Sequence, residues 1–221
     1  ANSENRRINH DLQSHFHCLV KNMRRIKEKK ERSLGIKLFL KGDRCNSPKC
    51  AMVRHPYRPG QHGQARHSVS EFGKQLQEKQ KIQILYGLNN HQMMRMFRNS
   101  DKDGIMTKLE SRLDHVVFLL GFAKSPRIAR QLVSHGHIHV NGRKVTIPSY
   151  YVRVKDIIAV RPESRSAKIF DDIQLRLKQY TPPEWLKLKA EELKGECVAK
   201  PPVTGVQLPF DINVVGQFYS R

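Results

Sequence analysis

The most regular alternation of apolar and polar positions lies between residues 110 and 161. Apolar residues recur with a 3.6-residue period over 111–120, which predicts a helix, and Gly121 ends it because glycine accepts the positive φ that a helix cap often needs. A second helix is predicted over 126–135, because Ser125 is a favoured N-cap and a proline follows at the first helical position. The pattern therefore predicts two short helices in succession.

A hairpin is predicted directly after these helices. Asn141 and Gly142 stand between two segments, 137–140 and 144–147, in which polar and apolar residues alternate. An Asn-Gly pair in this setting is the strongest short hairpin signal, because a type I′ turn needs positive φ at both central residues. We therefore expect a helix-helix-hairpin module over 110–171, with a basic surface.

Outside this module the pattern predicts mostly helices, joined by segments rich in turn-forming residues. We expect helices over 70–85, from Asn89 or Asn90 to about 98 and over 167–178, a short link over 99–108 with a solvated turn at 101–104, an irregular stretch over 195–209, and a strand over 212–219. The expected fold class is α+β, with a mainly helical first region and the module placed before a C-terminal tail.

The charge of the chain points to a partner. The chain has 41 Lys and Arg against 20 Asp and Glu, a formal charge of +21, and a pI near 10.2. This surplus predicts a polyanion partner, most simply nucleic acid. Basic residues outnumber acidic ones by 13 to 5 over 1–50, by 10 to 4 over 51–109 and by 11 to 5 over 110–171, but only by 7 to 6 over 172–221. We therefore expect the contact surface before residue 172, and a tail that packs mostly on protein.

An anionic membrane is the other polyanion to weigh, and the pattern disfavours it. No basic amphipathic helix with a strong apolar face is evident, and no apolar run approaches the ~20 residues that span a bilayer. The cysteines are spaced irregularly, which gives no disulfide framework and favours a reducing compartment. They are Cys18, Cys45, Cys50 and Cys197.

Little in the sequence points to catalysis. It contains no P-loop and no nucleotide-binding glycine motif, and its eleven histidines are dispersed. Asp114 follows Arg112 and Leu113, which resembles the aspartate motif of pseudouridine-forming enzymes, but a structural ion pair or a helix cap is the simpler interpretation. We expect no enzyme activity and no small-molecule substrate.

Candidate RNA contacts are cations, imidazoles and amides in settings that favour exposure. The second helix of the module places Arg127 and Arg130 on neighbouring turns, and the Asn-Gly turn projects the cations of the hairpin. A loop before the first long helix interleaves basic and aromatic residues with proline and glycine. The candidate RNA-binding residues are Arg54, Arg58, His62, Arg66, Lys79, Lys81, Arg112, Arg127, Arg130, Gln131, His135, His139, Asn141, Arg143 and Lys144.

Several spaced motifs are shared with a known family. Within the module they are SRLD at 111–114, ARQLV at 129–133, VNG at 140–142 and PSY at 148–150, and outside it LFLKG at 38–42, RPGQHG at 58–63, EKQK at 78–81, YG at 86–87 and FYSR at 218–221. Together they resemble bacterial-type small-subunit ribosomal protein four, including its RNA-binding module. The resemblance covers roughly residues 34–221, and residues 1–33 do not match the start of that family.

The resemblance implies an arrangement and a function. It implies a basic N-terminal extension over 1–33, a helical rRNA-binding domain over 34–109 and 172–221, and the module over 110–171. It also implies a structural constituent of the small ribosomal subunit, which binds rRNA at a helical junction, nucleates assembly of the subunit body, supports decoding accuracy and lies beside ribosomal protein five. The expected location is a ribosome in the bacterial cytoplasm, or alternatively in an organelle, either a mitochondrion or a plastid.

Contact with messenger RNA and the choice between functions stay open at this point. After Gly63 the family continues through several basic residues, whereas this chain retains only Arg66 before Ser70, so a role at the messenger entrance of the ribosome is in doubt. The alternative functions are an RNA-modifying enzyme and a stand-alone RNA-binding factor that use the same module. The 50 residues after the module carry no catalytic motif, which disfavours the enzyme.

A zinc site is a further implication of the resemblance. Cys45 and Cys50 resemble the second half of the family's four-cysteine zinc site, but Glu28 and Glu31 stand where the first pair is expected. Structural zinc takes four ligands, usually Cys or His. Cys18 is a candidate for one missing ligand, and the sequence is compatible both with a bound zinc and with metal-free buried cysteines.

Overall fold

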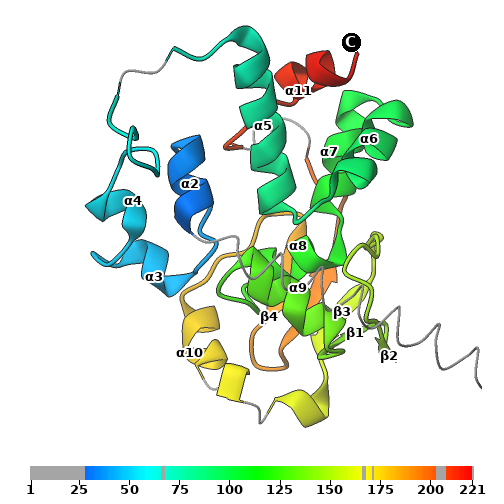
Figure 1. Cartoon of the computed structure of the whole chain (residues 1–221). Coiled ribbons are helices and arrows are strands. Elements are labelled where there is room, and N and C mark those ends of the chain that lie inside the picture. The colour runs from blue at the N-terminus through cyan, green and yellow to red at the C-terminus, as the bar shows by residue number, and fades with distance from the viewer. Residues whose placement is uncertain (1–27, 66–67, 166–167, 171, 203–207, 221) are drawn as a thin grey trace, which may run out of the picture. The chain divides into compact units, whose positions relative to one another are not determined.

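The structure, a computed structural model, describes residues 28–65, 68–165, 168–170, 172–202 and 208–220 (Figure 1). The described residues divide into two compact units, one drawn from 1–37 and 44–66 and the other from 38–43 and 67–221. The larger unit holds two apolar cores, the first among helices and the second between helices and a sheet.

Short helices and two buried cysteines make up the described part of the smaller unit. The helices are α2 (Glu28–Leu34), α3 (Asp43–Asn46) and α4 (Ala51–Arg54). Gly35, with φ of 70°, follows the last residue of α2, and Arg32 donates from Nε to the Tyr57 carbonyl oxygen at 3.0 Å. The Arg32 guanidinium also lies 5.0 Å from the centroid of the Tyr57 ring, so one cation fastens α2 to the loop after α4.

The first core of the larger unit is built by α5 (Glu71–Leu85), α6 (Asn90–Arg98), α7 (Lys102–Glu110) and α11 (Ile212–Tyr219). Ser70 caps α5 by accepting from the Gly73 N–H at 3.2 Å, and Asn89 forms a capping box with Gln92 at the start of α6. The predicted helices over 70–85 and after Asn89 are therefore confirmed. The buried residues of this core are Ile82, Tyr86, Leu88, Met93, Ile105, Met106, Leu109, Phe210 and Val215.

Two segments of this core differ from the predictions. The link expected over 99–108, with a solvated turn at 101–104, instead contains most of α7, and residues 212–219, expected as a strand, form α11. Asp211 starts α11, because its side chain accepts a backbone N–H two residues further on at 2.8 Å and its own N–H donates to Glu78 Oε2 at 3.0 Å. The β-branched residues suggested a strand, but this cap and the burial of Val215 among the helices favour the helix.

The module consists of α8 (Leu113–Leu119) and α9 (Pro126–Ser134) with a five-stranded antiparallel sheet. The strands are β1 (Ile138–Val140), β2 (Arg143–Lys144), β3 (Ile157–Val160), β4 (Leu186–Lys189) and β5 (Lys194–Cys197), in the order β2-β1-β3-β5-β4. Asn141 and Gly142 have φ of 50° and 77°, which confirms the predicted turn with positive φ at both residues.

The tail supplies two strands that the sequence did not suggest. β5 pairs with β3, with Gly195 opposite Ile158, and β4 forms the outer edge of the sheet. A Cβ atom at Gly195 would lie 2.5 Å from Leu120 Cδ1, so a glycine is needed for the end of α8 to pack this closely on the sheet. The stretch expected to be irregular over 195–209 therefore begins as a strand.

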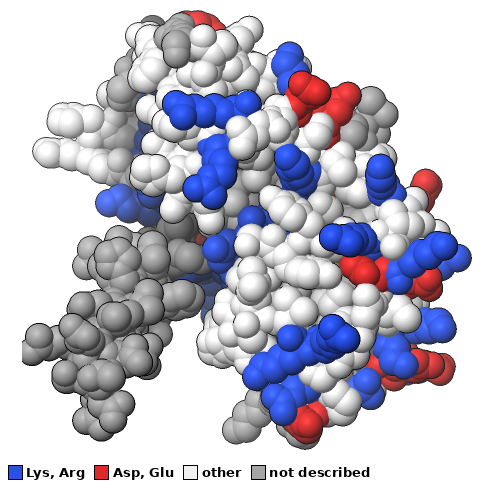
Figure 2. Space-filling view, turned by 90° about the vertical axis from the view of Figure 1, so that its right-hand side faces the viewer, with Lys and Arg blue, Asp and Glu red and all other residues white. Residues whose placement is uncertain are grey.

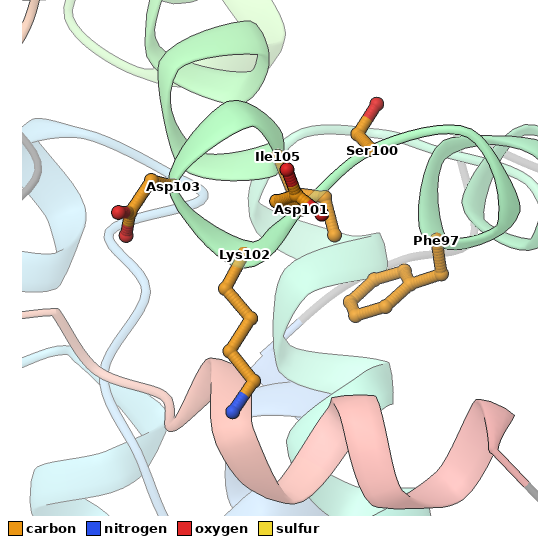
Figure 3. A pocket seen from close by; sticks show the side chains of 6 residues that line it. All are labelled: Phe97, Ser100, Asp101, Lys102, Asp103 and Ile105. Atoms are coloured by element: carbon orange, nitrogen blue, oxygen red, sulfur yellow. The ribbon is translucent and has the colours of Figure 1, made fainter.

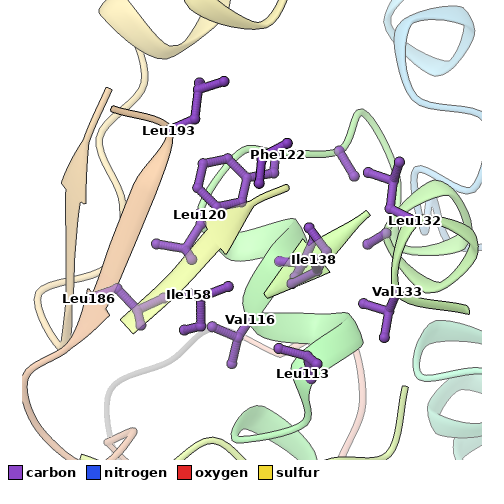
Figure 4. Close-up of a cluster of buried hydrophobic side chains, with 14 of the residues drawn as sticks. Leu113, Val116, Leu120, Phe122, Leu132, Val133, Ile138, Ile158, Leu186 and Leu193 are labelled. Carbon is purple, nitrogen blue, oxygen red and sulfur yellow. The ribbon is translucent and has the colours of Figure 1, made fainter. Parts of the chain in front are cut away.

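The core of the module joins its helices, its sheet and part of the tail (Figure 4). Its buried members include Leu113, Val116, Leu120, Phe122, Leu132, Val133, Ile138, Ile158, Trp185, Leu186 and Leu193. Of the helix expected over 167–178, residues 173–178 form α10 (Ile173–Lys178), which packs on this core, whereas residues 168–170 form a 3-10 turn, η2 (Lys168–Phe170). A further 3-10 turn, η1 (Pro162–Ser164), follows β3.

The distribution of the tail differs from the predicted division of the chain. The prediction assigned all of 172–221 to the helical domain, whereas Ile173, Leu177 and residues 185–197 of the tail contribute to the core of the module. Residues 208–219 contribute to the helical core instead. The α+β fold class is confirmed.

Candidate nucleic-acid interface

Helix α9 presents one polar side to solvent. Ser125 caps it by accepting from the Ile128 N–H at 3.4 Å, while Ala129, Leu132 and Val133 are buried in the core. On its other side Gln131 and His135 are exposed, and Arg127 and Arg130 are half-buried. Sequence and structure therefore agree that α9 carries amides and cations on a surface beside the hairpin.

Arg130 is held by the protein rather than free at this surface. Its Nη1 atom donates to the carbonyl oxygens of Tyr86 at 3.3 Å and Gly87 at 3.0 Å, and it lies 3.3 Å from Asp114 Oδ2. Burial lowers the pKa of Arg130 from its ordinary value, and the Asp114 charge opposes that effect. The guanidinium thus ties α9 to the C-terminal end of α5, and any contact it makes with RNA adds to a structural role.

Arg112, another candidate, is buried with only 2% of its surface exposed. Its guanidinium makes two parallel hydrogen bonds to Asp114, Nε to Oδ1 at 3.0 Å and Nη2 to Oδ2 at 2.8 Å. Asp114 Oδ1 also accepts from the His115 N–H at 3.0 Å. This geometry is the structural ion pair expected for Asp114, whose side chain is buried.

A second buried polar group adjoins this ion pair. Tyr86 Oη donates to Glu110 Oε1 at 2.5 Å, and His115 Nε2 lies 3.0 Å from Glu110 Oε2. Burial opposes ionisation of Glu110, but the hydrogen bond and charge of His115 and the bond from Tyr86 hold its pKa below the ordinary value. Burial, and next the neighbouring Glu110, raise the pKa of Tyr86 well above 10.0.

These two groups together form what we term the joint. Its members come from the end of α5, the end of α7, the start of α8 and the middle of α9. The joint therefore fixes the module relative to the helical core through charge-assisted hydrogen bonds, in addition to apolar packing. The residues of the joint are Tyr86, Glu110, Arg112, Asp114, His115 and Arg130.

The hairpin presents the other candidates of the module. Arg143 and Lys144 are exposed, and His139 is half-buried beside Lys144 in the adjacent strand. The Asn141 amide is already engaged: Nδ2 donates to Asp156 Oδ1 at 2.8 Å, and Oδ1 accepts from the Ile157 N–H at 2.9 Å. Asn141 therefore braces the turn against β3, and the neighbouring cations face solvent.

Cations also cover surfaces that the sequence analysis did not single out. Figure 2 shows Lys and Arg side chains spread over one face of the molecule, with Asp and Glu in a few small groups. On α6, His91, Arg95 and Arg98 are all exposed, at positions i, i+4 and i+7 of one helix face. These three residues could have been found from the sequence, because charged residues at helical spacing share one face of a helix.

Arg58 and His62 of the smaller unit lie at a tight turn, whereas Arg54 is the last residue of α4. Arg54 and His62 are exposed and Arg58 is half-buried. The Gly63 N–H donates to the Gly60 carbonyl oxygen at 3.2 Å, and a Cβ at Gly63 would lie 1.9 Å from the Arg58 carbonyl oxygen. The turn therefore requires its glycine, and it presents a basic and an imidazole side chain. The candidate Arg66 lies outside the described residues.

Lys79 and Lys81 are largely covered by protein. Lys79 Nζ lies 4.4 Å from the Phe218 ring centroid and 5.3 Å from that of Tyr219, and burial lowers its pKa. Lys81 Nζ lies 2.5 Å from Glu78 Oε1. Both lysines therefore help to hold the C-terminal helix α11 or the surface of α5, and their role toward RNA remains a prediction.

The described residues do not supply a zinc site. Cys45 and Cys50 are buried, but no group of three or more His, Cys, Asp or Glu side chains within the described ranges is arranged to hold a metal ion. Glu28, which stands where a cysteine of the family's first pair is expected, pairs with Arg44 at 3.0 Å between Oε1 and Nε. A guanidinium at this carboxylate does not suit a cation site. Cys18 lies outside the described residues.

A hollow of about 420 Å³ lies beside α6 and the start of α7 (Figure 3). It is lined by Phe97, Ser100, Asp101, Lys102, Asp103 and Ile105. The Lys102 ammonium group is drawn toward α11, where Nζ donates to Asn213 Oδ1 at 2.8 Å. The two carboxylates and one tethered ammonium do not form a set suited to catalysis.

No helix in the described ranges is long and apolar enough to cross a membrane.

Sequence comparison supplies the class of protein. A family model described as "Ribosomal protein S4/S9 N-terminal domain" matches residues 22–116, and one described as "S4 domain" matches residues 111–158. The "Small ribosomal subunit protein uS4" of Caldicellulosiruptor bescii is 45% identical over 193 residues, which cover 85% of this chain and 93% of that protein. Proteins of the same name from Pelotomaculum thermopropionicum and Thermus thermophilus are 43% and 46% identical, with the same coverage.

The helical core and the helix-helix-sheet module thus have the sequence signature of ribosomal proteins, a class of non-enzymatic components of the ribosome. The chain belongs to the uS4 family of small ribosomal subunit proteins. The comparisons give no support to the alternative of an RNA-modifying enzyme. The resemblance inferred from the motifs is therefore confirmed.

Proposed function

We propose that this protein is a structural constituent of the small ribosomal subunit that binds small-subunit rRNA through its basic surfaces, without catalysis. The observation that carries the proposal is the module itself. In it α9 with its C-cap and the hairpin expose Gln131, His135, Arg143 and Lys144, in a chain with a formal charge of +21. The family to which the chain belongs supports the same conclusion.

The physical basis of such binding is shape and charge rather than base reading. Double-stranded RNA has a deep, narrow major groove, so proteins contact its phosphates, its 2′-hydroxyl groups and the shallow groove. Arginine forks and lysine ammonium groups on rigid elements suit phosphates. The joint keeps these elements rigid, because it fixes α9 to the helical core without using the exposed cations.

The resemblance extends this proposal in several directions. We propose that the rRNA target is a helical junction, that binding nucleates assembly of the subunit body, and that the protein supports decoding accuracy beside ribosomal protein five. The candidates Arg54, Arg58 and His62 of the smaller unit are proposed as further rRNA contacts. The proposed location is a ribosome in a reducing compartment, either the bacterial cytoplasm or an organelle.

Zinc is not part of the proposed mechanism. A zinc ion at Cys45 and Cys50 would need two further ligands, of which Cys18 is the remaining candidate from the sequence. Elemental analysis of the purified chain, with Cys45→Ser as the control, decides the matter. One equivalent of zinc that is lost in the variant would establish the site.

The test of the proposed function is the salt dependence of binding to a small-subunit rRNA fragment. When a protein neutralises Z phosphates, log K falls linearly with log salt with a slope of about −0.7Z to −0.9Z. About six contacts would give a slope between about −4 and −5. A slope shallower than about −2, or equal affinity for an uncharged polymer, would contradict the electrostatic proposal.

A further inference from the structure

The sheet of the module has one face in the core and one face that is open. Its inward residues are buried: Ile138, Val140, Ile158 and Val160. Alternate residues of a strand point to opposite faces, so the intervening positions point outward. His139 lies opposite Lys144 of β2 and Ala159 of β3. The Arg161 N–H donates to the His137 carbonyl oxygen at 2.8 Å, which continues the ladder by one pair. His137, His139, Lys144 and Arg161 therefore share the open face.

The end of α9 brings one more imidazole to this corner of the sheet. His135 follows the last residue of α9, and Gly136, with φ of 76°, turns the chain into β1. The rings of His135 and His137 are 6.1 Å apart. A Cβ at Gly136 would lie 2.2 Å from Lys144 Cε, so the lysine side chain crosses the glycine between the two imidazoles. We term these five residues the histidine corner: His135, His137, His139, Lys144 and Arg161.

His137 is the imidazole of the corner that contacts both 3-10 turns after β3. Its Nδ1 lies 2.9 Å from Ser164 Oγ of η1, and its ring packs edge-on against Phe170 of η2, 6.1 Å between centroids. The carboxylate on η1 is Glu163, which pairs with Arg161 rather than with His137.

The charges that face His137 are of one sign. Burial lowers the pKa of His137, and next the charges of His135, Arg161 and Lys144 lower it further. In the free protein the ring is therefore biased toward its neutral form. An anion placed among these groups reverses the repulsion, because an opposite charge within a few ångströms favours the protonated ring.

We propose that the histidine corner is a proton-coupled phosphate site, which holds one backbone phosphate of the RNA and takes up a proton on His137 as it binds. The inference rests on the proposed function, since it names the contact and its pH dependence within the same interface. Charge complementarity selects the occupant: Lys144, three imidazoles and Arg161, whose guanidinium also pairs with Glu163, match a phosphodiester with its negative charge. Ala159, the small outward residue beside His139, leaves the sheet surface accessible.

Two variants test the coupling on the full chain. We would measure affinity for an rRNA duplex at constant salt near pH 6 and near pH 8, the range in which imidazoles titrate. The parent should bind about five- to tenfold more tightly at the lower pH, because uptake of about one proton is linked to binding. His137→Gln keeps a polar partner for Ser164 and should lose most of this ratio. His55→Gln, which removes an exposed imidazole after α4 that is not among the candidate RNA contacts, should keep it.

The outcomes separate this inference from the proposed function. If His137→Gln keeps the parental pH ratio, or if His55→Gln loses it equally, the proton-coupled site is refuted while rRNA binding stands. If the parent binds no rRNA at either pH, the proposed function itself fails. NMR titration of the parent with inorganic phosphate needs no variant: the pKa of the His137 ring should rise on addition of phosphate, and an unchanged pKa overturns the proposal.

Discussion

Cations in the larger unit fall into two groups that the sequence does not distinguish. In the joint, Arg112 and Arg130 are covered by protein and use their donors on carboxylate and carbonyl oxygens. At the hairpin, Arg143 and Lys144 are exposed. The comparison shows that a basic residue in an RNA-binding module serves either the fold or the ligand, and that the partner of its guanidinium or ammonium group decides which.

The largest effect is expected inside the joint. Arg112→Ala removes two parallel hydrogen bonds and leaves the buried Asp114 carboxylate with Arg130 as its remaining cation. Breaking a buried ion pair costs about 3–5 kcal/mol of unfolding free energy. Urea unfolding should show this loss, whereas Arg143→Ala should stay within about 0.5 kcal/mol of the parent. Similar losses in both variants would remove the distinction between the two groups.

The hairpin turn comes next. Gly142→Val places a β-branched residue at a φ of 77°, where no neighbouring atom would clash but the backbone conformation itself is unfavourable. The strain should cost about 1–3 kcal/mol and displace the cations of the hairpin, so rRNA affinity should fall. Hydrogen exchange is the measurement: protection of α5 and α6 should persist. Loss of protection across 71–98, or rRNA binding equal to that of the parent, would contradict the prediction.

Arg130 and Arg127 sharpen the comparison on a single helix. Arg130→Ala removes donors from the Tyr86 and Gly87 carbonyl oxygens, and should cost about 1–3 kcal/mol of unfolding free energy. Arg127→Ala should change that free energy by less than about 1 kcal/mol and weaken rRNA binding. Thermal unfolding measures the stability of both variants, and filter binding measures their affinity for rRNA. If Arg127→Ala is the more destabilising of the two, the assignment of roles along α9 is reversed.

The smallest expected effect is the acid response of the joint. The pKa of Glu110 lies below its ordinary value of 4.5 in the folded chain, so its ionised form contributes stability above pH 4.5. That contribution should be lost as the pH falls from about 4.5 through the lower folded value. Glu110→Gln should flatten this part of the stability profile measured by urea unfolding. An unchanged acid profile in the variant would show that Glu110 does not govern it.

The parts of the fold that could be predicted from sequence are those with local signals. Asn141 and Gly142 specify their own turn, and Ser70 and Asn89 specify the starts of their helices. The β4–β5 hairpin lacks such a signal, since its turn includes Leu193 at a φ of 51°, which is held there because its side chain is buried. Tertiary packing, and not local preference, decides that turn.

The candidate site also has some features that local sequence signals predict and others that they do not. Exposure of Gln131, Arg143 and Lys144 follows from periodicity and turn geometry, both of which are local. Arg112 pairs with Tyr151 through an isolated β-bridge between distant segments, and its buried guanidinium pairs with Asp114. The histidine corner depends on the register of three strands. Contacts between segments far apart in the chain are not visible in local patterns, so these features required the structure.

The placement of β5 has a consequence for the order in which the chain acquires its structure. β3 ends at Val160, but its second neighbour in the sheet begins at Lys194, and α11 follows still later with its packing on α5. Pairings of such long sequence separation form slowly, because the entropy of closing the intervening loop is lost before any contact compensates for it. During synthesis neither core can close until these late segments have left the ribosome that makes them. A nascent chain stalled before Lys194 should therefore stay protease-sensitive throughout 111–160, however long it is left to fold.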